Sequence, residues 1–354
     1  GRIALALAGR WLFKMSDAGF AARSALFRAL SITGILNGAA IRQSKVWPNV
    51  DQPFCLLFAD NRLPGENDHF VLVSPEDEPS LNEKGRMRID ASDAIPIALD
   101  LAATQPTLIK TLYRGNALDL SVVQRIRTRA LETVRESCVL EDANKERKSL
   151  PKRRLEHETA RRACVPEQSE HKSQPKPRPE LESLGKYWVP ERGLYRGQGY
   201  IVGKRSDDDE FLEGYFQLGA RYSSHPFVAL TESLLPYQSQ GLQWPRKTQI
   251  YKAPLVLIRE GLKADRNQGR ALYSDEKLAY SESYYGFSAA ENPDGEFLAQ
   301  YLLVLVHSQL FEYWSLMTSA KFGVERESLQ LHDVESFPFV PPELLDQVAR
   351  RMVA

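Results

Sequence analysis

A short run of charged side chains is the first place in this sequence where chemistry could reside. In the segment YSDEKLAY, Asp275, Glu276 and Lys277 are the residue types with which a nuclease holds a metal ion and stabilises phosphate charge. The same segment fits a helix start, because Ser274 could cap a helix whose first turn is acidic. We favour the helix start, which leaves this run without a catalytic role.

Other catalytic templates do not occur in the sequence. There is no G-x-x-x-x-G-K-[ST] loop, no H-E-x-x-H, no G-x-S-x-G and no kinase signature. Gly197 and Gly199 form a G-x-G pair, but no helix start follows, so we interpret them as turn glycines. The six histidines are scattered without the spacing of a metal site. The sequence therefore nominates no catalytic residue and no metal ligand.

Basic and aromatic residues gather in the stretch GLQWPRKTQIYKAP. Nucleic-acid recognition needs cations for phosphates and side chains that reach base edges. This stretch supplies both kinds, and its members are Trp244, Arg246, Lys247, Tyr251 and Lys252. It is our main candidate for a DNA-facing surface, against the alternative of a solvated loop before a buried strand.

A second polar stretch, KADRNQGR, has the side chains that pair with guanine and adenine edges. Its candidate DNA-binding residues are Arg266, Asn267, Gln268 and Arg270.

The segment SAKFGVER follows a long apolar run and supplies two further candidates, Lys321 and Arg326. Gly323 suits the end of a helix. One interpretation places this segment on the DNA backbone or against the first unit of the chain. The other, which we favour slightly, is an internal ion pair that fixes the turn.

Composition limits the class of protein. Lys plus Arg and Asp plus Glu are balanced at 46 each, so any DNA binding must come from a local patch and not from net charge. The three cysteines are far apart, which argues against disulfides and zinc and favours a reducing, cytoplasmic location. The longest apolar run, residues 297–317, contains His307, Gln309 and Glu312, so we expect one buried helix and no membrane span.

The elements that must position these residues fall into an α/β pattern in residues 1–120. Strands are expected at RIALALAGRW, ITGILNGAAI, QPFCLLFAD and DHFVLVSP, with a helix at FAARSALFRAL. The first strand, the helix and the second strand predict a parallel βαβ unit, and the later strands are expected to pair antiparallel. Because the opening strand is apolar throughout, we expect neighbouring strands to precede Gly1.

The remaining sequence divides into a charged region and a second globular unit. Residues 121–185 are rich in Arg, Lys, Glu and Pro, and they predict charged helices followed by an extended linker. Residues 186–354 combine aromatic strands, the apolar strand APLVLI and the apolar helix, and they predict an α+β domain.

The opening run GRIALALAGRWLFK, the segment ILNGAAIRQSKVWPNVDQPFCLLFADN and FVLVSP resemble the closing third of the catalytic domain of an adenine-N6 DNA methyltransferase of restriction-modification systems. The second unit is similar to the target recognition domain of such enzymes, above all in YLLVLVHSQLFEYWSLMTSAKFGVERESLQLHDVESFPF. The resemblance covers nearly the whole chain apart from the charged region.

The resemblance implies a partial class I methyltransferase-like sheet, whose last strand runs antiparallel, followed by the target recognition domain. It also implies S-adenosylmethionine as the cofactor of the complete enzyme and double-stranded DNA as a partner. The Asn/Asp-Pro-Pro-Tyr/Phe loop of the family is not found, since ENPDG lacks the second proline and the aromatic. We therefore expect this chain alone to bind no cofactor and to have no catalytic activity.

The resemblance also suggests which aromatic residues could stack on a flipped base. In the family, the loop between the last two strands of the catalytic domain presents an aromatic residue, and the matching loop here is RQSKVWPNVDQPF. Trp47 is the first candidate for stacking and Phe54 the second. The alternative for Trp47 is packing against Pro48 in an ordinary loop.

A different class of protein remains open: a non-catalytic DNA-binding specificity subunit that acts with a partner carrying the methyltransferase region. The absent catalytic motifs favour this alternative, and the apolar opening strand opposes it. A third alternative is an inactive fragment.

Overall fold

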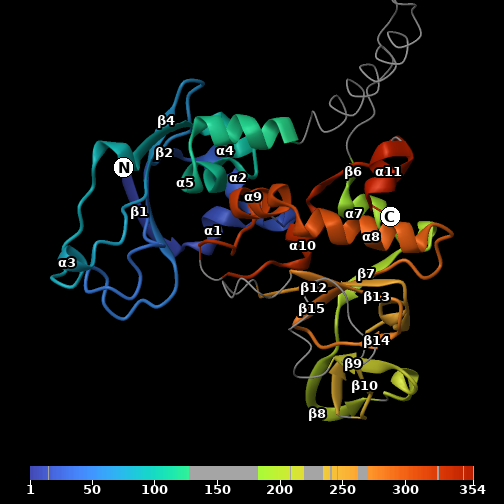
Figure 1. Ribbon diagram of the computed structural model, residues 1–354. Helices are drawn as coiled ribbons and strands as arrows, with labels where there is room; N and C mark the ends of the chain where they lie inside the picture. The colour runs from blue at the N-terminus through green and yellow to red at the C-terminus, as the bar shows by residue number, and fades with distance from the viewer. Residues whose placement is uncertain are drawn as a thin grey trace, which may run out of the picture.

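The computed structural model shows a mixed α/β chain with several separate sheets (Figure 1). It describes residues 1–14, 16–126, 182–207, 209–218, 234–239, 241–244, 246–261, 270–324, 327–345 and 347–353. Most of the predicted linker therefore lies outside the described residues. None of the helices in the described ranges has both the length and the hydropathy needed to cross a membrane.

The first unit is built on a five-stranded sheet in the order β1-β3-β2-β4-β5. The four expected strands are confirmed, and a fifth follows them. Their bounds are β1 (Arg2–Ala8), β2 (Ser31–Asn37), β3 (Phe54–Asp60), β4 (His69–Val73) and β5 (Ala94–Ala98).

The pairing of these strands differs from the expectation in two ways. β3 is antiparallel to both β1 and β2, so β1 and β2 run in the same direction with β3 inserted between them. β4 pairs with β2 in parallel, where antiparallel pairing was expected of the later strands. β4 does run opposite to β3, as expected of the next strand along the chain. It pairs with β2 and not with β3, however, and because β2 is also antiparallel to β3, the β2–β4 pairing is parallel.

Helices cover one face of this sheet (Figure 1). Ser16 caps the main helix by accepting a hydrogen bond from the Gly19 amide, and Phe27 on its inner side is buried. Residues 117–126 are also helical, and Val123 lies in the core of the second unit. The helices of the first unit are α1 (Arg10–Phe13), α2 (Asp17–Ala29), α3 (Pro79–Asn82), α4 (Leu99–Thr104) and α5 (Leu108–Arg114).

The other face of the sheet is apolar and open in the described part of the chain. Ala4 and Gly34 lie opposite Phe58 in the strand register, and Gly34 lies opposite Val71. Phe58 and Val71 are 43% and 40% exposed. The sheet thus buries one apolar face and leaves the other in contact with solvent.

The second unit is built on a four-stranded sheet in the order β13-β12-β15-β7, whose central strand β12 (Leu255–Arg259) is almost completely buried. Its other strands are β7 (Tyr195–Gln198), β13 (Ala271–Ser274) and β15 (Tyr284–Ser288). Smaller sheets are formed by β6 (Glu182–Ser183) with β16 (Pro338–Phe339), by β8 (Ile201–Asp207) with β11 (Leu242–Trp244), and by β9 (Phe216–Leu218), β10 (Leu234–Pro236) and β14 (Leu278–Ala279).

The single apolar helix expected from Phe297 is instead two helices, α8 (Gly295–His307) and α9 (Gln309–Thr318). Ser308 ends the first and caps the second, because its hydroxyl accepts a hydrogen bond from the Phe311 amide at 3.1 Å. The remaining helices of this unit are α7 (Leu184–Tyr187), α10 (Leu331–Glu335) and α11 (Gln347–Val353).

The two units meet where the turn after α9 lies against the first unit. The Lys110 ammonium donates to the Phe322 carbonyl at 2.7 Å, and the Arg42 guanidinium donates to the Val324 carbonyl at 2.8 Å. The Thr111 hydroxyl donates to the Met317 carbonyl at 3.2 Å. Among the described residues, the SAKFGVER segment is thus fixed by carbonyl contacts to the first unit, whereas the sequence slightly favoured an internal ion pair. Glu325 and Arg326 lie outside those residues.

Candidate nucleic-acid interface

Trp47 and Phe54 form an aromatic pair on the loop between β2 and β3. Their ring centroids are 4.8 Å apart and the rings are inclined at 33°. Phe54 is buried at the start of β3, whereas Trp47 is 36% exposed. The indole therefore packs on a buried ring and keeps one part of its surface for solvent, an arrangement that suits stacking on a base.

The loop that carries Trp47 is held by its own backbone. The Gln43 amide donates to the Val50 carbonyl at 3.0 Å, and the Gly38 amide donates to the Phe54 carbonyl at 2.8 Å. Phe54 lies directly over Gly38, where a Cβ would come within 2.3 Å of the ring. Only glycine at this position leaves room for the buried ring, so Gly38 helps to set the position of the aromatic pair.

Three members of the predicted basic stretch lie on one exposed surface beside the β8–β11 ribbon. Trp244 is 55% exposed at the end of β11, and the Arg246 guanidinium lies 5.6 Å from the centre of its ring. Lys247 is exposed next to them. A cation over an exposed indole, with a second cation beside it, can contact both a phosphate and a base. We call Trp244, Arg246 and Lys247 the ribbon cluster.

The other two members of that stretch are placed differently. Tyr251 is fully buried against Tyr280, with ring centroids 4.9 Å apart, and this burial raises the pKa of its phenol. Lys252 forms an ion pair with Glu291 at 3.3 Å. Tyr251 is therefore a core residue and not a surface contact, because its ring packs in a hydrophobic cluster of the second unit.

The second polar stretch contributes one described residue. Arg270 donates to the Ser308 carbonyl at 3.2 Å and pairs with the Glu312 carboxylate, so it ties β13 to α9. This engagement gives Arg270 a structural role that spacing alone did not indicate. Arg266, Asn267 and Gln268 lie outside the described residues.

A cavity of about 540 Å³ at the junction of the two units brings Lys14 of the first unit to Lys321 of the second. Gln198 and Gln330 also line it. We call it the junction cavity. The stem of Lys14 packs on Gly19, where a Cβ would come within 2.5 Å of it. No pattern in the sequence pointed to Lys14, because Lys321, the other lysine of the cavity, lies some 300 positions away in the sequence.

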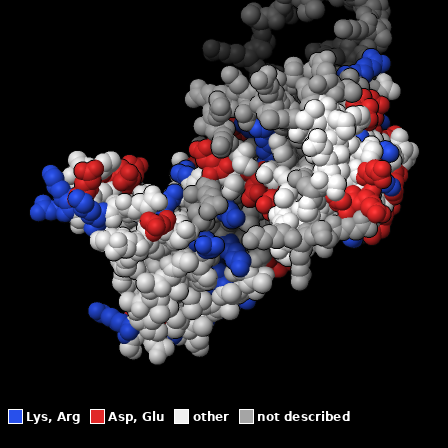
Figure 2. Space-filling model, turned by 90° about the horizontal axis from the view of Figure 1, so that it is seen from below, with Lys and Arg blue, Asp and Glu red and all other residues white. Residues whose placement is uncertain are grey.

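Lys and Arg side chains gather on one face of the molecule. Figure 2, which views the chain from below, shows them in the middle of that face, with Asp and Glu side chains close by and a larger acidic group at the right. The chain is neutral overall, so DNA binding would depend on a local group of cations such as this one.

Glu260 and Asp333 place two carboxylates in the lining of the junction cavity beside Lys14 and Lys321. Asp333 is buried, and so is Lys110 on α5. Burial raises the pKa of Asp333, whose carboxylate accepts hydrogen bonds from the Gln330 amide at 2.7 Å and the Ser319 hydroxyl at 2.8 Å. Burial, assisted by the charge of Arg114, lowers the pKa of Lys110 to about 7. Both side chains hold the turn between α9 and α10 and so position Lys321.

The segment YSDEKLAY, which contains Asp275, Glu276 and Lys277, forms a turn between β13 and β14. Ser274 ends β13, and its hydroxyl accepts a hydrogen bond from the Glu276 amide at 3.1 Å and donates to the Glu276 carbonyl at 2.9 Å. The expected capping is present, but it closes a turn and not a helix. No group of three or more possible metal ligands occurs in the described ranges.

The lining of one described cavity, just after β2, disfavours S-adenosylmethionine. The cofactor carries a positive sulfonium, and its sugar and base are bound in open α/β sheets at the carboxyl ends of strands. The cavity that includes Ala39, just after β2, is lined by Arg42 and Arg114, and Glu327 is the only acid among the described residues of its lining. Two guanidinium groups favour an anion there and disfavour a cation.

Comparisons with solved structures gave matches that include two proteins of restriction-modification systems. The type IIG restriction endonuclease BpuSI aligns with a TM-score of 0.34 and 8% identity, over 99% of this chain and 41% of that one. A structure of the type I restriction-modification system aligns with a TM-score of 0.25 and 9% identity, over 42% of this chain and 35% of that one. This chain thus spans about two fifths of the length of BpuSI. No protein-family model and no curated protein matches it.

Proposed function

We propose that this chain is the DNA target-recognition portion of an adenine-specific (N6) DNA methyltransferase of a restriction-modification or related phage-defence system. The complete enzyme uses S-adenosylmethionine, and the portion described here contributes DNA binding, base stacking and target recognition. The supporting observation is that an aromatic pair with one partly exposed ring, a cation-bearing ribbon and a cavity with lysines from both units occur in one neutral chain.

The chemistry of the target explains this combination. The adenine amino group is hidden in a duplex, so the base must leave the stack, and a flipped base needs an aromatic surface to replace its lost neighbours. The pair of Trp47 and Phe54 offers such a surface. The ribbon cluster supplies cations that hold the DNA backbone while nearby side chains test base edges.

A specificity subunit that acts with a separate methyltransferase partner is the alternative. It is favoured by the absence of an Asn/Asp-Pro-Pro-Tyr/Phe loop from the sequence and by the poor fit of the described cavity after β2 to the cofactor. Both hypotheses predict DNA binding. They differ in whether the methyltransferase region belongs to the same polypeptide.

The direct test is fluorescence anisotropy with a labelled duplex over a series of salt concentrations. Wild-type protein should bind DNA, with an affinity that falls as salt rises. Replacing both Arg246 and Lys247 with alanine should weaken binding about 10-fold or more and reduce the salt dependence, because two phosphate contacts are lost. Lys252→Ala is the matched control, since its ion pair with Glu291 already occupies it. Wild-type protein that fails to bind DNA at low salt would refute the proposed function.

A further inference from the structure

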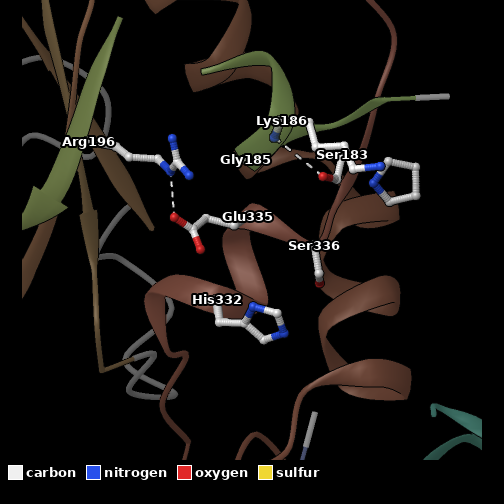
Figure 3. Close-up of a pocket in the computed structure, with 8 residues that line it drawn as sticks. Ser183, Gly185, Lys186, Arg196, His332, Glu335 and Ser336 are labelled. Atoms are coloured by element: carbon white, nitrogen blue, oxygen red, sulfur yellow. Dashed lines mark hydrogen bonds and ion pairs between the residues drawn. The ribbon is translucent and has the colours of Figure 1, made fainter. Parts of the chain in front are cut away.

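A second polar cavity lies beside the junction cavity, within the second unit. Its volume is about 560 Å³, and Lys186, Arg196, His332 and Glu335 line it together with Ser183 and Ser336 (Figure 3). None of these residues belongs to the stretches that the sequence marked as DNA-facing. We call this space the α10 cavity, because α10 supplies two of its four ionisable groups.

Three elements place the charged groups around one space. Arg196 extends from β7, Lys186 lies on α7, and His332 and Glu335 lie on α10 (Figure 3). The Arg196 guanidinium is fixed, because its Nε donates to the Glu335 carboxylate and one terminal nitrogen donates to the Trp188 carbonyl. The cavity therefore has one wall in which a cation is held at a set position.

The charge of the cavity is not balanced. Among the described residues that line it, Glu335 is the only carboxylate and is paired with Arg196, which leaves the Lys186 ammonium as excess positive charge. Lys186 and His332 are exposed, and within the described residues no side-chain hydrogen bond is found for either. Ser183 adds a hydroxyl that can donate. A set of donors with net positive charge suits an anion with several acceptor oxygens, such as a phosphate group.

The position of His332 connects this cavity to the proposed interface. His332 lines the α10 cavity and also the junction cavity that holds Lys14 and Lys321. The two cavities thus lie on either side of one exposed side chain. A polyanion that crosses the junction of the units can continue over α10 and meet Lys186 next.

We propose that the α10 cavity binds a backbone phosphate of the same DNA, outside the recognition loops. This inference rests on the proposed function. A duplex backbone fits better than a free nucleotide, because small-ligand sites are mostly apolar and a nucleotide base needs a stacking surface. The described residues of this lining include no aromatic ring other than the His332 imidazole. Contacts of this kind position DNA and carry no sequence information.

The test compares Lys186→Ala with wild-type protein in the same anisotropy assay, with salt varied between about 50 and 200 mM. Loss of one phosphate contact should reduce the slope of log affinity against log salt by about 1 and weaken binding to target and unrelated duplexes alike. His332→Ala should weaken binding in the same uniform way. Arg28→Ala, which removes an exposed cation at the end of α2, should leave the slope unchanged.

The outcomes separate this inference from the proposed function. Wild-type protein that binds DNA, together with a Lys186→Ala slope equal to that of wild type, would overturn the phosphate subsite and leave the proposed function standing. Absence of DNA binding by wild-type protein would refute both. Calorimetry with pyrophosphate distinguishes the source of the phosphate: if Lys186→Ala abolishes pyrophosphate binding but leaves the DNA slope unchanged, the cavity takes free phosphates and the assignment to DNA is wrong.

Discussion

At the scale of single residues, Lys110 is a buried cation whose pKa is lowered. It is fully buried, its ammonium donates to the Phe322 carbonyl, and burial lowers its pKa from the ordinary 10.5 to about 7. Between these two pKa values the unfolded chain binds the proton and the folded chain does not. The free energy of unfolding should therefore rise with pH across this window, by up to about 1.4 kcal/mol per pH unit, and be insensitive to Lys110 below it.

Replacing Lys110 with methionine should remove this contribution, because the thioether does not titrate. Urea unfolding at several pH values between about 7 and 10 should give a flatter dependence for Lys110→Met than for wild-type protein. Lys186→Met, at an exposed lysine, is the control and should keep the wild-type dependence. Parallel curves for wild type and Lys110→Met would show that Lys110 keeps its ordinary pKa.

At the scale of elements, the loop between β2 and β3 depends on one glycine. Gly38→Ala would place a Cβ about 2.3 Å from the Phe54 ring, which cannot retreat without displacing Trp47. Overpacking of this kind costs about 1–3 kcal/mol, so we expect a matching loss in the free energy of unfolding together with weaker DNA binding.

Urea unfolding measures the first effect and anisotropy the second. Gly65→Ala is a suitable control, because its added Cβ would lie 3.5 Å from the nearest atom, an ordinary contact. A Gly38→Ala protein with wild-type stability would mean that the loop can rearrange and that Gly38 does not set the aromatic pair.

At the scale of the whole molecule, the open apolar face of the first sheet should govern solution behaviour. Exposed apolar patches promote association, and Phe58 is the most exposed large side chain of this face. Phe58→Ser should reduce self-association, seen by sedimentation velocity, and should change stability by no more than about 0.5 kcal/mol.

The neighbouring Leu57 provides the contrast, because it points to the covered face and is fully buried. Leu57→Ala should destabilise the protein by about 2–5 kcal/mol. Self-association that is unchanged by Phe58→Ser would show that this face is not the surface through which copies meet.

The sequence by itself located part of the first unit. Apolar runs located β1 to β4 and helical spacing located α2, because each pattern reflects burial along a single segment. The sequence did not locate β5, α1, α3, α4 or α5. The family resemblance nominated Trp47 and the residue types nominated the ribbon cluster, and the structure leaves these residues at least partly exposed. The sequence did not find the break at Ser308, since the residues on both sides are equally apolar and only the cap separates the helices.

Only the tertiary structure decided strand order and the composition of the sites. The insertion of β3 between β1 and β2 depends on pairing across the sheet, which no local pattern encodes. Tyr251 and Arg270 were drawn into packing and pairing by neighbours distant in sequence, while Lys14 and Lys321 were brought to one cavity. A residue type states what a side chain can do, but contacts between distant segments determine whether it is buried, paired or left facing solvent.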